Sequence, residues 1–127
     1  IYLDGIMQSR LYGQTAYHEA LVHPAMITHR EPKRVAIIGG GEGATLREVL
    51  KYKSVETVTM VEIDEKMVEV CREYLPEWSD CDGHSCFDDP RTELLLTDAS
   101  AWFVDEFSDK SKLDPSKRYD VIIMDAL

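Results

Sequence analysis

Several features that would assign a sequence to a class of protein are missing from these 127 residues. No apolar run reaches the roughly 20 residues that span a bilayer, and no charged leader followed by an apolar segment suggests a signal peptide. Basic residues are scarce: 14 Lys and Arg stand against 24 Asp and Glu, a formal net charge of −10. This charge argues against nucleic-acid binding and favours a cationic ligand, and we predict no membrane partner.

Cysteine is scarce too, with three residues in the chain. An odd number of cysteines favours a reducing compartment, and we predict a cytoplasmic location. Cys71, Cys81, His84 and Cys86 suggest a zinc cluster, but the spacing C-x2-H-x-C is not that of a standard zinc site. We therefore interpret residues 79–90 as a polar surface loop with incidental thiols, and we predict no metal site.

The ends of the chain lack familiar features as well. It begins with Ile1 instead of Met and stops directly after an apolar run, so we expect a fragment of a longer protein, from which an upstream targeting segment could be missing. The length suits one domain, and a hydrophobic fraction of 44% allows a core.

Short apolar runs alternate with helical patterns. A turn at Asp4-Gly5 precedes a short strand, and residues 16–27 have a helical pattern that Pro24 should bend or break. Apolar runs rich in β-branched residues predict strands at 34–38, 55–63, 92–97 and 118–127. Helical spacing predicts helices at 44–52, 65–75 and 99–107, and a polar loop follows at 110–117. The alternation predicts an α/β fold with a parallel sheet covered on both faces.

Acidic residues follow the predicted strands. Ligands of an open α/β sheet bind outside the carboxyl ends of its strands, where the sequence places Glu42, Glu62, Asp98 and Asp125. Each acid alone could instead cap a helix or occupy its first turn, where carboxylates are stabilised. All four at one edge of the sheet favour a negatively charged ligand site.

The glycine turn after residues 34–38 is compatible with two kinds of adenosine ligand. Gly39, Gly41 and Ala44 fit G-x-G-x-x-A, and Glu62 stands where a ribose-binding acid is expected. Glu42 would repel a pyrophosphate by about 1–4 kcal/mol. Unless its side chain points to solvent, Glu42 therefore favours S-adenosylmethionine or its decarboxylated form, which carry positive groups.

Six segments, in this order, cover most of the chain: LDGIMQS (3–9), YHEALVHPAM (17–26), VAIIGGGEGATLREVLKY (35–52), VTMVEIDEKMVEVCREYLP (58–76), DPRTELLLTDA (89–99) and YDVIIMDA (119–126). With them the chain resembles the polyamine aminopropyltransferases, the family of spermidine, spermine and thermospermine synthases. The resemblance implies a Rossmann-like fold of the S-adenosylmethionine-dependent methyltransferase type at 16–127, truncated at its C-terminal end. It also implies that residues 1–15 are a remnant of an N-terminal β-hairpin domain.

The same resemblance implies a reaction. The family moves the aminopropyl group of decarboxylated S-adenosylmethionine, a co-substrate, to an amine and releases methylthioadenosine, with no prosthetic group. The full-length protein would then be a homo-oligomer, a dimer or tetramer, and the fragment itself would be inactive. Which amine is the acceptor, putrescine or spermidine, stays open, because the residues that measure its length would lie largely after Leu127.

Roles carry over position by position. The resemblance implies a nucleoside site of Gln8, Glu62 at the ribose, and Asp98 and Ala99 at the adenine, and an amine site of Tyr17, His18, Glu42 and Asp125. The glycine pattern adds Gly39 and Gly41 to the residues that bind the co-substrate, and Glu42 is counted with them as well. Asp125 would orient or deprotonate the attacking amine. Because an ordinary Asp has a pKa near ~3.9 and an alkylamine near ~10.4, we expect Asp125 chiefly to position the amine.

The sequence departs from the family in two places. The acidic D-E pair that many members have before the YHE motif is absent from RLYGQTAYHE (10–19), and the D-S-S-D of many spermidine synthases is replaced by Asp125-Ala126-Leu127. The latter, with LVHPAM and GGGEG, leans towards thermospermine-type members. Two alternatives remain: an S-adenosylmethionine-dependent methyltransferase, and a non-catalytic relative that binds a nucleoside or a protein partner.

Overall fold

A four-stranded parallel sheet forms the centre of the molecule, with the strand order β7-β4-β3-β8. The computed structural model describes residues 1–108, 114 and 117–126. The strands are β3 (Arg34–Gly39), β4 (Thr57–Glu62), β7 (Thr92–Leu96) and β8 (Val121–Asp125). All four predicted strands are present, so the predicted α/β fold with a parallel sheet is confirmed.

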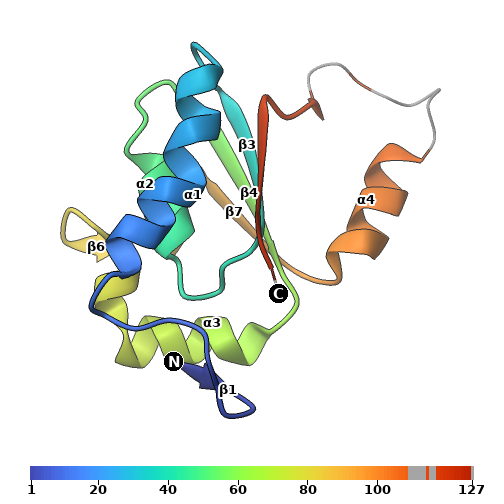
Figure 1. The fold of residues 1–127 in the computed structure, drawn as a ribbon. Coiled ribbons are helices and arrows are strands. Elements are labelled where there is room, and N and C mark those ends of the chain that lie inside the picture. Colours follow the sequence, from blue (N-terminus) through green and yellow to red (C-terminus); the bar gives the residue numbers. More distant parts are fainter. Residues whose placement is uncertain (109–113, 115–116, 127) are drawn as a thin grey trace.

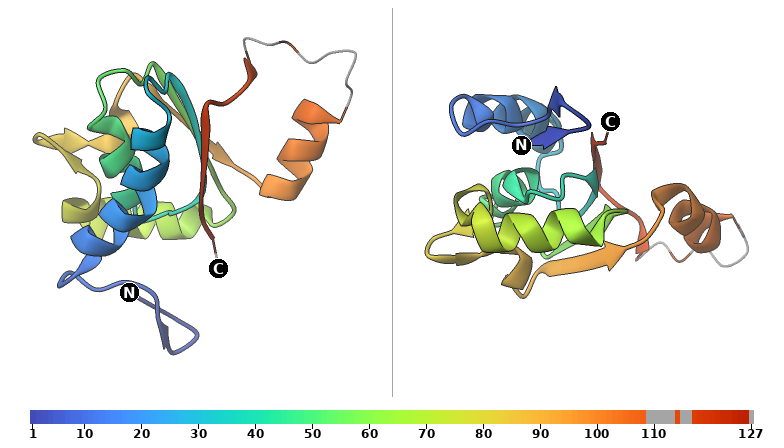
Figure 2. Two further views of the ribbon diagram at one scale, coloured as in Figure 1. Left: turned by 45° about the horizontal axis from the view of Figure 1, so that its top comes forward. Right: turned by 90° about the horizontal axis from the view of Figure 1, so that it is seen from below.

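Helices cover the two sides of this sheet. Helices α1 (Gln14–Thr28), α2 (Ala44–Leu50) and α3 (Glu65–Tyr74) lie on one side, and α4 (Ala99–Phe107) lies on the other (Figures 1 and 2). The predicted helices coincide with α2, α3 and α4, except that α2 ends at Leu50 and α3 at Tyr74. The apolar faces of α1, α2 and α3 close a core against the sheet, to which α4 contributes no buried residue.

The strand order reverses next to β3. From β3 the chain runs outward to β4 and β7, and then it returns to place β8 on the other side of β3. Such a reversal opens a crevice at the carboxyl ends of the two strands that flank it. The register pairs Gly39 with Asp125, so the glycine turn lies directly against the end of β8.

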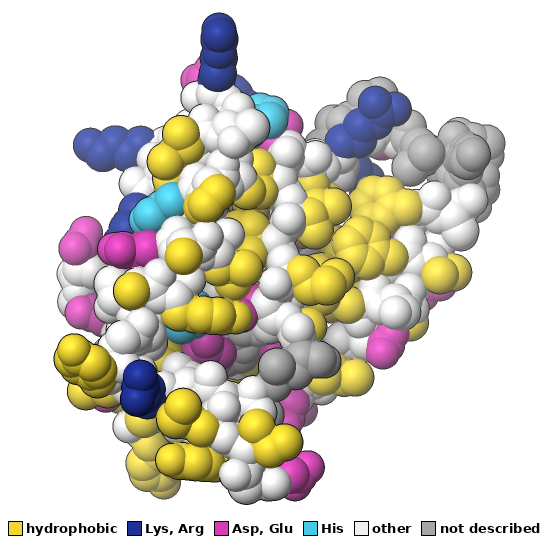
Figure 3. Space-filling model, in the orientation of Figure 1, with side chains coloured by type: hydrophobic (Ala, Val, Ile, Leu, Met, Phe, Trp, Pro, Cys, Tyr) yellow, Lys and Arg dark blue, Asp and Glu magenta, His cyan; other side chains and the backbone are white. Residues whose placement is uncertain are grey.

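The strands differ in how deeply they are buried. In β3 and β4 the four central residues are buried on both faces, as the apolar run at 34–38 predicts. In β8 the pattern alternates, and Ile122 and Met124 are exposed. An apolar groove of about 530 Å³ lies between α4 and β8, with Phe103, Phe107 and Ile122 in its wall. Figure 3 shows hydrophobic side chains gathered on this side of the molecule.

Helix α1 continues through Pro24, so the prediction of a break there is wrong. Proline removes one backbone hydrogen bond from a helix interior. Packing against α2 compensates for the loss, because Val22 and Met26 on either side of the proline are fully or almost fully buried. The Thr28 hydroxyl also donates to the Pro24 carbonyl at 2.7 Å, which satisfies an acceptor near the helix end.

The interpretation of residues 79–90 as a surface loop with incidental thiols is also wrong. The segment forms a small hairpin of β5 (Asp80–Cys81) and β6 (His84–Ser85), between the short 3-10 turns Pro76–Trp78 and Cys86–Asp88. Cys81 and Cys86 form a disulfide, and Cys86 is completely buried. The two cysteines are five positions apart, and the hairpin brings them together. The sequence prediction tested the cysteines only against the spacing of zinc sites and so missed this bond.

The argument for a reducing compartment therefore loses its basis, because two of the three cysteines are paired. The remaining one, Cys71, is buried, and burial raises the pKa of its thiol to about 11. This thiol stays protonated and unreactive at neutral pH.

The N-terminal residues form a hairpin of β1 (Tyr2–Leu3) and β2 (Ile6–Met7) around the predicted Asp4-Gly5 turn. Both turn residues have positive φ, which Gly and Asp tolerate. Within the described residues, every helix is too short or too polar to cross a bilayer. The predicted loop at 110–117 lies mostly outside the described residues.

Candidate active site

A cavity of about 850 Å³ opens at the carboxyl ends of the strands. It is bounded by the N-terminal hairpin, the start of α1, the glycine turn, the ends of β4 and β8, and the start of α4. All ten residues singled out from the sequence line it: Gln8, Tyr17, His18, Gly39, Gly41, Glu42, Glu62, Asp98, Ala99 and Asp125. Residues up to 117 positions apart in the sequence thus line one cavity. This is expected where ligands bind outside the carboxyl ends of parallel strands.

The glycines of the turn are required by neighbouring protein atoms. A Cβ on Gly39 would lie 2.4 Å from the carbonyl oxygen of Asp125, and one on Gly40 would lie 2.9 Å from its Oδ2. Both glycines also have positive φ. A Cβ on Gly43 would lie 2.6 Å from Cβ of Ser79. The turn is glycine-rich because β8 and the 3-10 segment press against it, whatever ligand the cavity holds.

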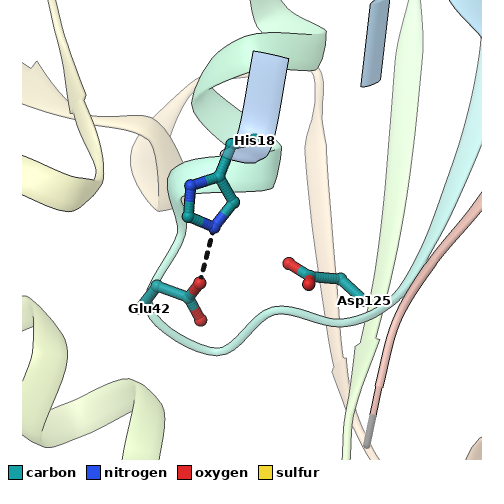
Figure 4. A group of neighbouring side chains, drawn as sticks. All are labelled: His18, Glu42 and Asp125. Carbon is teal, nitrogen blue, oxygen red and sulfur yellow. Dashed lines mark hydrogen bonds and ion pairs between the residues drawn. The ribbon is translucent and has the colours of Figure 1, made fainter. Parts of the chain in front are cut away.

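His18 and Glu42 form a pair that lines the cavity, with His18 buried and Glu42 partly buried (Figure 4). Nε2 of His18 lies 2.9 Å from Oε1 of Glu42, and Nδ1 lies 2.6 Å from the carbonyl oxygen of Gln14. Both ring nitrogens therefore face acceptors, which only the doubly protonated ring satisfies. Burial lowers the pKa of His18, but the hydrogen bond and charge of Glu42 and the Gln14 carbonyl outweigh it, so the pKa is raised.

Asp125 ends β8 beside this pair and points towards it (Figure 4). Its Oδ2 accepts a hydrogen bond of 2.5 Å from the Thr45 hydroxyl, and its Oδ1 lies 3.4 Å from the Tyr17 hydroxyl. Burial raises the pKa of Asp125; the Thr45 hydrogen bond opposes the rise, and the charge of Glu42 adds to it. The carboxyl is therefore a better proton acceptor than an ordinary Asp.

The other two acids lie towards α3 and α4. Glu62 is 8% exposed, and its Oε1 accepts from the backbone nitrogen of Asp64 at 2.9 Å. Asp98 is the N-cap of α4, where its Oδ1 accepts from the backbone nitrogen of Ala101 at 2.8 Å. The capping alternative is thus realised for Asp98, which nevertheless lines the cavity.

Two carboxylates, Glu42 and Asp125, lie beside the His18 ring and make this part of the cavity suited to a cation. The ligand atoms of His18, Glu42 and Asp125 lie within 4.8 Å of one another, which is close enough for a metal ion. Both ring nitrogens of His18 are already engaged, however: Nε2 pairs with Glu42 and Nδ1 faces the carbonyl oxygen of Gln14. The two carboxylates are better suited to an ammonium or sulfonium group, which they attract without displacing the His18 proton.

A second group of possible metal ligands consists of Glu19, His23 and Glu48 on the facing sides of α1 and α2. Glu48 is completely buried, and both of its oxygens are already paired. Arg47 donates to Oε1 at 3.1 Å and Lys51 to Oε2 at 2.6 Å. Glu48 is therefore the centre of an ion-pair network that His23 joins from α1 at 3.5 Å.

Two residues of the site were missed in the sequence. Thr45 is completely buried and holds Asp125, but the only signal for it is a hydroxyl in the first turn after the glycines. Gly40 falls on an unspecified position of G-x-G-x-x-A, so the pattern gave it no weight. Thr45 bonds to Asp125 and Gly40 lies against its carboxyl, although Asp125 is 80 or more positions away in the sequence.

Known proteins resemble this chain over nearly its whole length. A family model described as spermine/spermidine synthase domain matches residues 14–127. Polyamine aminopropyltransferase 1 of Hyperthermus butylicus is 49% identical over 123 residues, which are 97% of this chain and 39% of that protein. Polyamine aminopropyltransferase 2 of Pseudomonas aeruginosa is 49% identical over 98% of this chain and 32% of its own length.

Solved structures agree with these matches. A spermidine synthase in complex with the transition state analogue AdoDATO superposes with a TM-score of 0.84 and 38% identity, over 99% of this chain and 38% of that one. The spermidine synthase of Thermotoga maritima gives a TM-score of 0.83 and 39% identity, over 99% of this chain and 39% of that one. The chain thus spans less than two fifths of the length of these relatives.

Proposed function

Because this chain belongs to the spermine/spermidine synthase family, we propose that the full-length protein is a polyamine aminopropyltransferase. It transfers the aminopropyl group of decarboxylated S-adenosylmethionine to putrescine or spermidine and releases methylthioadenosine. One observation carries the proposal: Glu42 and Asp125 approach each other beside His18 in a cavity that Glu62 and Asp98 also line. Four carboxylates around one space suit a co-substrate with a sulfonium and an ammonium group.

The two ends of the cavity suit the two ends of that co-substrate. Glu62 offers Oε2 to the ribose hydroxyls, since its Oε1 is held by the backbone nitrogen of Asp64. Asp98 and Ala99, with Gln8 from the N-terminal hairpin, surround the adenine. Glu42 receives the ammonium of the aminopropyl group, so that the carbon next to the sulfonium lies near Asp125.

The reaction is a displacement at that carbon. The lone pair of the neutral acceptor amine forms the new N–C bond while the C–S bond breaks. The electron pair of the C–S bond stays on sulfur, which leaves as the thioether of methylthioadenosine. The new ammonium then loses a proton towards Asp125 and solvent. Burial raises the pKa of Asp125, which favours this proton transfer, and the Tyr17 hydroxyl lies 3.4 Å from its Oδ1.

Glu42 and Asp125 also favour decarboxylated S-adenosylmethionine over S-adenosylmethionine itself. Ordinary S-adenosylmethionine carries a carboxylate next to its amine, and this group would face Glu42 and Asp125. Like charges at about 4 Å cost roughly 1–4 kcal/mol in surroundings from water-like to surface-like. Exclusion of the carboxylated nucleoside distinguishes an aminopropyltransferase from a methyltransferase built on the same fold.

The test uses the full-length protein with decarboxylated S-adenosylmethionine and either putrescine or spermidine. We expect methylthioadenosine to form, and we expect titration calorimetry to show far weaker binding of S-adenosylmethionine than of the decarboxylated form. If the two nucleosides bind equally, the role of Glu42 is wrong. If the full-length protein releases no methylthioadenosine with either amine, the proposed activity is wrong.

Substitution of Asp125 separates binding from reaction. Asp125→Asn should lower kcat by about 100-fold or more, while methylthioadenosine affinity is retained. Asp105→Asn makes the same chemical change on the exposed side of α4, away from the cavity, and should have wild-type kinetics. A fully active Asp125→Asn protein would refute the assigned role.

The acceptor, the product and the assembly are further parts of this proposal. Products formed with the two amines side by side identify the acceptor, including thermospermine if spermidine is used. A homo-oligomer, dimer or tetramer, and a cytoplasmic location stay predictions, which light scattering and cell fractionation test.

A further inference from the structure

Thr45 makes the shortest hydrogen bond to the proposed reactive carboxyl. It lies in the first turn of α2 and is completely buried, and its Oγ1 donates to Oδ2 of Asp125 at 2.5 Å. The bond joins residues 80 positions apart and links α2 to the end of β8. A buried hydroxyl that donates to a carboxylate is a charge-assisted bond, which is stronger than one between neutral groups.

The surroundings of Asp125 leave few ways to orient its carboxyl. Gly40 lies so close that a Cβ there would be 2.9 Å from Oδ2, and Tyr17 reaches Oδ1 only at 3.4 Å. The other titratable and charged groups that face Asp125 are His18 from α1 and Glu42 from the glycine turn. Glu42 repels the carboxylate and His18 already pairs with Glu42, so Thr45 is the group that holds Oδ2.

We propose that Thr45 is a positioning residue for the aminopropyl transfer: its hydroxyl holds Oδ2 of Asp125, so that Oδ1 faces the cavity and accepts the N–H of the attacking amine. This inference rests on the proposed function. It assigns Thr45 a role through Asp125, without contact between Thr45 and the substrate. Without the hydroxyl, the carboxyl loses its fixed orientation, and its charged form loses a stabilising donor.

Two substitutions separate the hydroxyl from the packing of the side chain. Thr45→Val keeps the shape and removes the hydroxyl, whereas Thr45→Ser keeps the hydroxyl and removes a methyl group. In the full-length protein, Thr45→Val should lower kcat by about 10- to 100-fold, with little change in methylthioadenosine affinity. Thr45→Ser should stay close to the wild type. The reverse order of the two variants, or an unchanged kcat in Thr45→Val, would overturn the proposal.

The pH dependence gives a second readout that a packing role would not change. The Thr45 hydrogen bond lowers the pKa of Asp125, so its loss raises that pKa further. The acid limb of kcat/KM should therefore move to higher pH in Thr45→Val and not in Thr45→Ser. An acid limb that stays in place in Thr45→Val contradicts the proposed coupling.

A titration that needs no turnover separates this inference from the proposed function. The side-chain carboxyl of Asp125, labelled with ¹³C, is followed by NMR in the wild type and in both variants. We expect a higher pKa in Thr45→Val alone. If the wild type releases no methylthioadenosine, the proposed function fails, and an unchanged carboxyl titration in Thr45→Val would separately refute the bond between Thr45 and Asp125.

Discussion

At the scale of single residues, the two central carboxylates are held by different kinds of partner. Glu42 pairs with the imidazole of His18, whereas Asp125 accepts from the neutral hydroxyls of Thr45 and Tyr17. Both carboxylates line one cavity, and burial raises the pKa of Asp125. The sequence suggested Asp125 as a poor base with an ordinary pKa, and its burial changes that expectation in favour of proton transfer.

The His18 pair predicts a pH-dependent stability. Its pKa is raised above 6.5, so the stabilisation is fully present below that ordinary value and is lost as the pH rises through the folded-state pKa. At about pH 6, His18→Gln should lower the free energy of unfolding of the full-length protein by about 1–3 kcal/mol, as expected for a hydrogen bond to a charged group. Urea denaturation between about pH 6 and pH 9 should show this difference shrinking.

His29→Gln is the matched control, because His29 at the end of α1 is exposed and its pair with Asp120, at 3.8 Å, is of the exposed kind that contributes about 0–1 kcal/mol. It should leave the stability and its pH profile nearly unchanged. A difference between wild type and His18→Gln that stays constant over the whole range would show that His18 is not protonated in the folded protein.

At the scale of elements, side chains attach the helices to the loops that shape the cavity. Arg47 on α2 donates to Oε1 of Gln14 at the start of α1 and to the carbonyl oxygen of Trp78, both at 2.9 Å. Ser79 and Phe87, on either side of the disulfide hairpin, press against the N-terminal end of α2, where Gly43 has no room for a side chain. The glycine turn thus packs against residues 79–90, the segment that the sequence analysis interpreted as a surface loop.

The entry into β7 depends on one buried ion pair. Asp89 accepts from Nε and Nη2 of Arg91 at 2.9 and 2.8 Å, and these bonds lower the pKa of Asp89. The stabilisation is therefore present above the ordinary value of 3.8 and is lost as the pH falls through the folded-state pKa. Asp89→Asn should lower the free energy of unfolding by about 1–3 kcal/mol at neutral pH.

Asp88→Asn is the comparison for that substitution, since Asp88 also pairs with an arginine but is far more exposed. Its side chain is 59% exposed against 9% for Asp89. An exposed pair contributes about 0–1 kcal/mol, so Asp88→Asn should change the melting temperature little. The effect of Asp89→Asn should fade below about pH 4; equal effects of both variants would contradict the role of burial.

At the scale of the whole molecule, topology and charge act on the same place. The reversal of strand order beside β3 opens the cavity, and the acids around it belong to a chain with a net charge of −10. A negative cleft raises the local concentration of cations and speeds their association. The other side of the sheet has a different character, because the groove between α4 and β8 is apolar.

This negative charge predicts that added salt lowers the affinity of cationic ligands and leaves that of uncharged ligands unchanged. Between about 50 and 500 mM NaCl, the affinity of the full-length protein for decarboxylated S-adenosylmethionine should fall roughly tenfold, because the screening length shortens. Methylthioadenosine, which carries neither positive group, is the control, and its affinity should stay nearly constant. Titration calorimetry measures both, and parallel losses for the two nucleosides would argue against an electrostatic site.

The sequence by itself determined the succession of strands and helices along the chain, the parallel sheet, and the residues at the carboxyl ends of its strands. These follow from short-range periodicity and from the rule that carboxyl ends of parallel strands meet, which need no knowledge of distances. The tertiary structure decided how the side chains at that edge are paired. That Thr45 meets Asp125, that His18 is held between Gln14 and Glu42, and that Cys81 bonds to Cys86 all depend on side-chain direction and burial. The continuation of α1 through Pro24 depends likewise on packing, which outweighs a local preference of the chain.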